Sequence, residues 1–306
     1  MIRLDETAQG VFVIAVTPFQ PDGSLDLAGV DGMVEFYLER GATGLTILGI
    51  LGEAPKLSSA EAVLFARHVL LRVAGRVPVV VGVSGTGFVP MGELARDVMD
   101  EGAAAVMVAP PATLRTDDQL VGYLATVADM LGDVPLVLQD FPSASGVQMS
   151  VPLIRRLIAM RPTIVMLKAE DWPGLGKISA LRTGDGRRVS ILVGNGGLFL
   201  PEELRRGADG AMTGFAFPEM LRDVVAAHAA GDAERAQNLF DAYLPYVRYE
   251  QQQGVGLSAR KHVLAQRGAI PHATLRRPFA PLSADDIADI DFLLARQARR
   301  LAELGA

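Results

Sequence analysis

The stretch TIVMLKAE, residues 163–170, decides the fold of this chain. Four consecutive apolar residues are followed directly by a lysine and, two positions later, by a glutamate. A run that is apolar throughout, without alternating polar residues, is typical of a strand buried on both faces of a parallel sheet. The stretch therefore predicts a parallel strand with polar residues at its end.

Seven further short apolar runs flank this one along the chain. Each is followed by a loop with glycine or proline and then by a segment with helical periodicity. They cover residues 11–16, 45–48, 77–83, 104–108, 135–139, 189–193 and 210–213. Eight such units predict an α/β fold, a closed (β/α)₈ TIM barrel. The runner-up is an open doubly wound sheet, which would normally have a GxGxxG turn where this chain has TPFQ at 17–20.

The pattern changes after residue 217. Residues 218–306 contain no convincing strand, only helical stretches, among them 232–251 and a last helix opened by Ser283 with Asp286 in a capping box. We therefore predict a barrel in residues 1–230 and a C-terminal helical extension in residues 231–306.

Composition narrows the possible functions. Of the 306 residues 50% are hydrophobic, which suits a large buried core, and no apolar run is long enough for a membrane span. The charged N-terminus lacks the apolar stretch of a secretory signal. With a net charge of −6 and no basic cluster interleaved with aromatics, nucleic acid is not an expected partner. We expect a cytoplasmic protein that binds neither membrane nor nucleic acid.

Two absences bear on metal and nucleophile chemistry. The sequence has no cysteine, which excludes disulfides, thiolate metal sites and cysteine nucleophiles. The four histidines lie in or beside predicted helices, away from the strand ends. Zinc sites usually need histidine ligands, and a Ser-His-Asp triad needs a histidine base. We expect no metal and no cofactor.

Lys168 is the strongest candidate for chemistry. The chain has four lysines against 25 arginines, and this lysine ends the sixth predicted strand. Active sites of (β/α)₈ barrels gather at the C-terminal ends of the strands. There a buried primary amine can lose its proton and attack a carbonyl carbon to form a Schiff base. The alternative is a strand-end lysine whose ammonium group reaches solvent.

Other strand ends supply candidate binding residues. Polar and glycine-rich segments follow the second, fifth, seventh and eighth strands, and their backbone amides could hold a carboxylate, a phosphate or a hydroxyl. The alternative for the glycines is a set of tight turns. The candidates for substrate binding are Gly49, Ile50, Leu51, Gln139, Asp140, Gly194, Asn195, Gly196 and Thr213.

With Lys168 on the sixth strand and GILGE at 49–53, the chain resembles the superfamily of dihydrodipicolinate synthase and N-acetylneuraminate lyase. These are class I pyruvate-dependent aldolases, and GILGE stands where the family has G-[ST]-T-G-E. The resemblance covers essentially the whole chain, including VTPF at 16–19. It implies that Lys168 forms a Schiff base with a 2-keto acid. It also implies a homo-oligomer, either a tetramer or a dimer.

The departures from the family pattern bear on the reaction. Ile50 and Leu51 replace a pair of hydroxyl residues, and Gln139 replaces a tyrosine that shuttles protons, which an amide cannot do. The loop after the fourth strand reads PPATL at 110–114, where the family usually has a second relay tyrosine. Ala144 aligns near an arginine that grips the aldehyde substrate of the synthases. These differences argue against dihydrodipicolinate synthase activity.

A second set of motifs is similar to a subgroup that contains L-2-keto-3-deoxyarabonate dehydratase. QDFP at 139–142 with Ser145-Gly146 carries this similarity, and MTG at 212–214, Phe217-Pro218 and Glu250 with Gln253 fit it. The resemblance implies a Schiff-base lyase, most simply a dehydratase of a 2-keto-3-deoxy sugar acid. A pyruvate-dependent aldolase and a barrel that binds keto acids without turnover are the alternatives. Chain length and stereochemistry of the substrate stay open.

Some other group must move protons in place of the tyrosines. Glu170 is the preferred catalytic acid or base, because it lies on the same strand face as Lys168 if the strand continues. Its alternative is a carboxylate at a helix N-terminus. Asp140 has the opposite parity to Gln139 and could brace a neighbouring loop. Thr17 and Glu53 are expected to have structural roles, and Trp172 either walls the pocket or belongs to the core.

Overall fold

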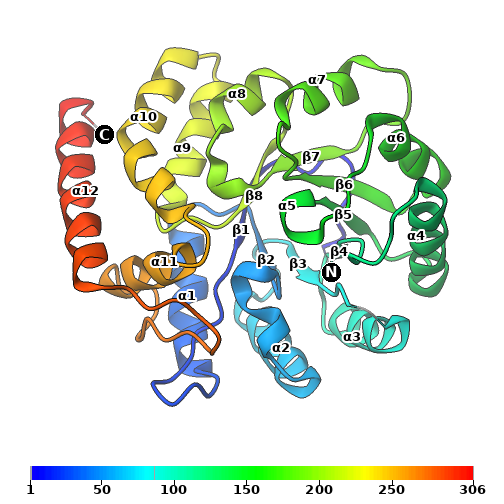
Figure 1. Cartoon of the computed structure of the whole chain (residues 1–306), viewed down its shortest axis with the longest axis horizontal. Helices are drawn as coiled ribbons and strands as arrows, with labels where there is room; N and C mark the ends of the chain where they lie inside the picture. The colour runs from blue at the N-terminus through cyan, green and yellow to red at the C-terminus, as the bar shows by residue number, and fades with distance from the viewer. Residues whose placement is uncertain (1, 86, 306) are drawn as a thin grey trace.

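The computed structural model describes residues 2–85 and 87–305. Within them, eight parallel strands pair in chain order, and β8 pairs with β1 to close a barrel (Figure 1). The predicted TIM barrel is thereby confirmed, with every strand boundary within two residues of its predicted position. The strands are β1 (Gly10–Ile14), β2 (Gly44–Ile47), β3 (Val79–Gly82), β4 (Ala105–Val108), β5 (Leu136–Asp140), β6 (Ile164–Ala169), β7 (Ser190–Val193) and β8 (Gly210–Thr213).

Alternation along the strands divides the core into two layers. Phe12, Val80, Met107 and Met166 belong to an apolar cluster inside the barrel, distinct from the larger cluster between the strands and the helices. Because side chains on a strand alternate between faces, Lys168 shares the interior face with Met166 and lies nearer the C-terminal mouth.

Helices surround the barrel (Figure 1). Their starts follow from local sequence, as at α2, where Ser58 and Glu61 form the capping box that fixes the first turn. The surrounding helices are α1 (Leu27–Glu39), α2 (Ser59–Val73), α3 (Phe88–Asp100), α4 (Asp117–Leu131), α6 (Val151–Met160), α7 (Leu175–Thr183), α8 (Leu200–Arg205) and α9 (Pro218–Ala229). Short turns also follow strands at the C-terminal mouth: η1 (Ile50–Gly52), η2 (Ala54–Lys56), α5 (Pro142–Ser145) and η3 (Asn195–Gly197).

Three further helices form the C-terminal part: α10 (Ala233–Glu250), α11 (Gly256–Gln266) and α12 (Ala284–Glu303). Figure 1 shows α12, in red, as the outermost helix beside α10. Its predicted capping box of Ser283 and Asp286 is present. The predicted boundary between barrel and C-terminal extension, at residue 230, falls in the turn between α9 and α10. It stays a proposal, because α10 packs extensively on α9. No helix in the described ranges is long and apolar enough to cross a membrane.

Glu203 on α8 is a carboxyl buried between the helices and the barrel. Its surroundings include Leu167 of β6 and Ile178 of α7, and its Oε2 has no hydrogen-bond partner among the described residues. Burial, reinforced by the charges of Glu202 and Glu170, raises its pKa from 4.5 to about 8. In the folded protein the Glu203 carboxyl is therefore mostly protonated at neutral pH.

We expect Glu203 to make the protein less stable as pH rises from about 5 to about 8. In this window the unfolded chain has released the Glu203 proton while the folded protein still holds it, so the free energy of unfolding falls with rising pH. Glu203→Gln should remove a decrease in the free energy of unfolding on the order of 3 kcal/mol over this window. The measurement is urea unfolding of both proteins at the two pH values.

Glu93 is an exposed carboxyl on α3, and Glu93→Gln is the matched control. It should leave the pH dependence of the free energy of unfolding unchanged. Burial also raises the pKa of Asp140, to about 6. That group titrates in wild type and variant alike, so the difference between their curves reports Glu203. Identical curves for wild type and Glu203→Gln would contradict the assignment.

Candidate active site

A cavity of about 420 Å³ opens at the C-terminal ends of the strands. It is lined by Gln139 of β5, Lys168 of β6, Glu170 directly after β6 and Thr213 of β8. Its volume lies in the range of small-molecule sites. A second cavity of about 440 Å³ lies between α6, α7 and the loop before β7, where most of its polar lining residues are arginines. We place the candidate active site in the first cavity because it contains the lysine.

Lys168, Glu170 and Gln139 form a compact buried group. Lys168 Nζ lies 2.9 Å from Glu170 Oε2, and Gln139 Nε2 donates a hydrogen bond of 2.7 Å to the same oxygen. Each of the three residues is only 5% exposed. Glu170 Oε1 accepts no hydrogen bond from a described residue. The arrangement allows a proton to pass between amine and carboxylate and leaves one carboxylate oxygen for a ligand.

Strand pairing explains why these three side chains meet. Gln139 and Lys168 are register partners on β5 and β6. Although β6 ends at Ala169, the Glu170 amide still donates to the Asp140 carbonyl at 2.9 Å, so the extended backbone continues by one residue. Glu170 therefore keeps the interior direction of Lys168, as the alternation predicts.

The loop after β7 supports Glu170 from behind. A Cβ at position 194 would lie 2.3 Å from Cγ and Oε1 of Glu170, so the side chain occupies space that only glycine leaves free. Asn195 Nδ2 donates to the Glu170 carbonyl at 3.2 Å. The Gly196 amide donates to Thr213 Oγ1 at 2.8 Å, and the Gly197 amide to the Gly194 carbonyl. Because these two amides already have acceptors, they are not free to hold an anion, contrary to our expectation for this loop.

We expect Gly194→Ala to lower kcat about tenfold, because displacing a catalytic group by a fraction of an ångström is costly to rate. The fold should survive, since the added methyl group meets the movable Glu170 side chain. Steady-state kinetics together with a circular dichroism spectrum measure both effects. Gly176→Ala on α7 is the control, because nothing lies within 4 Å of its added Cβ. Equal kcat for both variants would count against the packing role.

The loop after β2 offers unused backbone donors. Ile50–Gly52 form the turn η1, and the side chains of Ile50 and Leu51 line the cavity. The amides of Ile50 and Leu51 open this turn and therefore have no acceptor within it. Gly49 precedes them and does not itself line the cavity. The loop can hold a carboxylate through its backbone although the family's hydroxyl side chains are missing.

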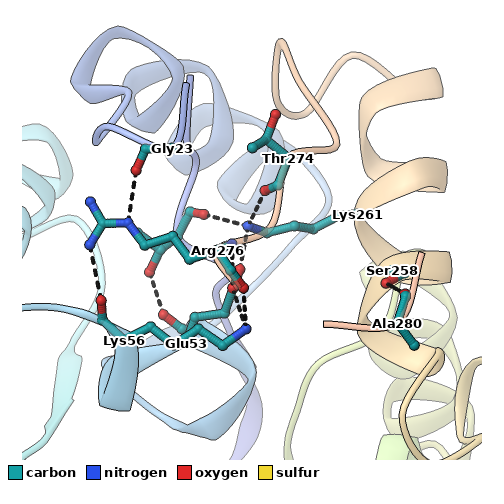
Figure 2. A network of polar contacts seen from close by, with 10 residues as sticks. Gly23, Glu53, Lys56, Ser258, Lys261, Thr274, Arg276 and Ala280 are labelled. Carbon is teal, nitrogen blue, oxygen red and sulfur yellow. Dashed lines mark hydrogen bonds and ion pairs between the residues drawn. The ribbon is translucent and has the colours of Figure 1, made fainter. Parts of the chain in front are cut away.

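Glu53 directly follows this loop and is 1% exposed. Figure 2 shows the network of polar contacts around it. Lys261 Nζ donates to its Oε1 at 2.6 Å, and Lys56 Nζ and the Arg276 amide donate to Oε2 at 2.9 and 3.0 Å. Lys261 also donates to the Thr17 carbonyl at 2.7 Å, and burial lowers the pKa of Lys261 to about 8. Glu53 and Thr17 thus join the loop to the C-terminal extension and do not line the cavity.

Asp140 and Trp172 also lie outside the cavity. Asp140 is fully buried on the outer face of β5, where its Oδ2 accepts a hydrogen bond of 2.6 Å from Lys177, which also binds Asp171. This placement corrects its assignment as a substrate-binding residue, because strand alternation turns it away from Gln139. Trp172 is 45% exposed and packs edge-on against Phe199, so it is neither a wall of the cavity nor part of the core.

Arg260 on α11 was not among the predicted site residues, yet it lines the cavity although it is only 2% exposed. The adjacent pair Arg260-Lys261 stands among small and apolar residues of a helix, and this was the available signal for buried cations. Gln251 and Gln252 were not predicted either. The described residues contain no group of three or more His, Cys, Asp or Glu side chains placed to hold a metal ion.

Known proteins resemble this chain over nearly its whole length. Residues 7–296 match the model of the dihydrodipicolinate synthetase family. The chain is 32% identical over 301 residues to L-2-keto-3-deoxyarabonate dehydratase of Azospirillum brasilense, covering 97% of this chain and 95% of that protein. A crystal structure of dihydrodipicolinate synthase from Rhodopseudomonas palustris is 50% identical, with a TM-score of 0.94 over 97% of this chain and 100% of the other. A prophage protein of the dihydrodipicolinic acid synthase family from E. coli K12, solved in complex with pyruvate, is 25% identical with a TM-score of 0.86, covering 95% and 98%.

Proposed function

The chain belongs to the dihydrodipicolinate synthetase family and is a lyase of that family. We propose that it dehydrates a 2-keto-3-deoxy sugar acid through a Schiff base on Lys168. The observation that carries the proposal is the Glu170 carboxylate 2.9 Å from Lys168 Nζ, next to Gln139 in place of a tyrosine. The similarity to a protein named L-2-keto-3-deoxyarabonate dehydratase supports the same reaction.

The first step forms the imine. The substrate carboxylate binds the amides of Ile50 and Leu51, which places the C2 ketone in the cavity with Lys168. Glu170 accepts a proton from the Lys168 ammonium group, and the neutral amine attacks C2. Glu170 returns this proton to the C2 oxygen, which leaves as water. The protonated imine that remains withdraws electrons and makes the C3 protons acidic.

The second step eliminates water from C3 and C4. Glu170 takes a proton from C3 to give an enamine. The enamine expels the C4 hydroxyl, which leaves as water after receiving that proton back from Glu170. Hydrolysis of the unsaturated imine then returns the amine of Lys168. The net change is the loss of one water molecule, and tautomerisation of the released product gives a dioxo acid.

The aldolase alternative uses the same imine but breaks the C3–C4 bond. It requires a base for the C4 hydroxyl proton and releases pyruvate and an aldehyde. The relatives named 4-hydroxy-tetrahydrodipicolinate synthase keep this alternative open, for example that of Streptomyces coelicolor, 33% identical over 290 residues. A barrel that binds keto acids without turnover is the third possibility.

Trapping and product analysis together test the proposal. Borohydride added in the presence of pyruvate should give a covalent adduct that peptide mass spectrometry localises to Lys168. A panel of 2-keto-3-deoxy sugar acids should then yield a dioxo acid. Release of pyruvate would assign the aldolase instead, and an adduct without any turnover would assign the binding protein. Absence of an adduct at Lys168 would overturn the Schiff-base mechanism itself.

A further inference from the structure

Part of the cavity wall comes from the C-terminal extension. The segment 251–254 between α10 and α11 contributes Gln251, Gln252 and Gln253, and α11 contributes Leu257 and Arg260. The side chain of Gln251 packs over Gly196, where a Cβ would lie 2.0 Å from its Nε2. The extension therefore meets the barrel loops directly at the cavity and completes its wall.

Arg260 is held rigidly in this wall. Its Nε donates to Glu250 Oε1 at 2.5 Å, while Glu250 Oε2 accepts the Ala216 amide at 3.2 Å. A Cβ on Gly214 would lie 2.4 Å from Arg260 Nη1, so the guanidinium group fits against glycine at the end of β8. Neither side chain of the pair is exposed by more than 2%. The guanidinium group is thus preorganised.

Arg260 retains unused hydrogen-bond donors. Among the described residues, only its Nε has a partner, and Nη1 is a buried donor with no acceptor. Leaving a buried donor unpaired costs about 1–3 kcal/mol, so an oxygen supplied by a ligand beside the guanidinium group would be favoured.

Charge decides which kind of oxygen fits. Arg260 is already paired with Glu250 at 2.5 Å, and Lys168 is paired with Glu170 at 2.9 Å. The remaining polar side chains of this wall are uncharged glutamine amides. The wall therefore has directed donors but no unpaired cation to balance a second carboxylate, and burying an uncompensated charge is costly.

We propose that Arg260 and the segment 251–253 form a subsite for the uncharged, hydroxylated end of the substrate, with Arg260 donating to a hydroxyl oxygen beyond C4. This inference rests on the proposed function and narrows its substrate class. The enzyme then prefers keto-deoxy sugar acids with one carboxylate over the corresponding acids with a carboxylate at each end.

Three substrates of equal chain length test the subsite: a 2-keto-3-deoxy aldonic acid, its terminal deoxy analogue and the matching aldaric acid. In the wild type, kcat/KM for the aldonic acid should exceed that for either of the others at least tenfold. In Arg260→Met the preference over the deoxy analogue should fall towards unity. Trapping of pyruvate on Lys168 should persist in this variant. Arg299→Met, an exposed arginine on α12, should retain the wild-type preferences.

The outcomes separate the subsite from the reaction. Equal kcat/KM for the aldonic acid and its deoxy analogue in the wild type would overturn the subsite, with dehydration intact. The subsite is overturned equally if folded Arg260→Met keeps the wild-type preference. Should Arg260→Met not fold, the wild-type comparison of the aldonic acid with its deoxy analogue decides. Gln253→Ala, at an exposed position, is then the second variant, and an unchanged preference for the aldonic acid in it would overturn the subsite. Absence of dehydration for all three acids, despite trapping, would overturn the proposed function and the subsite with it.

Discussion

Lys168→Ala is expected to lower kcat at least a thousandfold and to abolish borohydride trapping of pyruvate. The variant lacks the amine that forms the imine, and no other described lysine lines the cavity to replace it. Lys168→Arg should be equally inactive although it keeps the positive charge, since a guanidinium group does not form the imine. Steady-state kinetics and the mass of the trapped protein are the measurements.

Lys177→Arg is the matched control for that experiment. Lys177 is also largely buried and pairs with Asp140 and Asp171 outside the cavity, where a retained positive charge should suffice. We expect it to retain most of the wild-type kcat and the adduct at Lys168. Turnover by Lys168→Ala at a rate near that of the wild type would refute the Schiff-base mechanism.

Glu170→Gln should lower kcat by about 10²–10⁴-fold, the range typical for loss of a general acid or base. The amide keeps the shape of the side chain but cannot accept the C3 proton. Trapping with pyruvate should still occur, more slowly, because Lys168 is unchanged. Exchange of the pyruvate methyl protons for deuterium, followed by NMR, reads the proton transfer directly and should be lost.

Asp171→Asn is the control for Glu170→Gln, because Asp171 is adjacent in sequence but binds Lys177 outside the cavity. Per folded molecule it should keep the exchange rate within about threefold of the wild type. If Glu170→Gln exchanges the methyl protons as fast as the wild type, another group is the base. Glu170 would then serve only to orient Lys168.

The fold was predictable because its signals are local. Each strand is a continuous apolar run bounded by glycine or proline, and Ser58 and Ser283 mark helix starts through contacts three residues away. The interior direction of Lys168, Gln139 and Glu170 follows from strand alternation alone. The same rule placed Asp140 on the other face, and its inclusion among the binding residues went against that parity.

What the sequence did not predict depends on contacts between distant segments. Arg260 reaches the cavity only because α11 returns to the end of β8, where Gly214 leaves room for its guanidinium group. No periodicity along the chain encodes that approach. The amides of Gly196 and Gly197 likewise have acceptors that depend on the exact turn of η3.

The contact between Lys261 and Glu53 also bears on when, during its synthesis, the chain becomes able to bind 2-keto acids. The two residues are 208 positions apart, so Glu53 leaves the ribosome long before its buried partner does. Until Lys261 and Arg276 have emerged, the loop at 50–52 lacks the support beneath it. We expect nascent chains that end before residue 261 to have no affinity for 2-keto acids, even where all eight strands are complete. We therefore expect binding competence only after α11 and the loop that carries Arg276 have been synthesised.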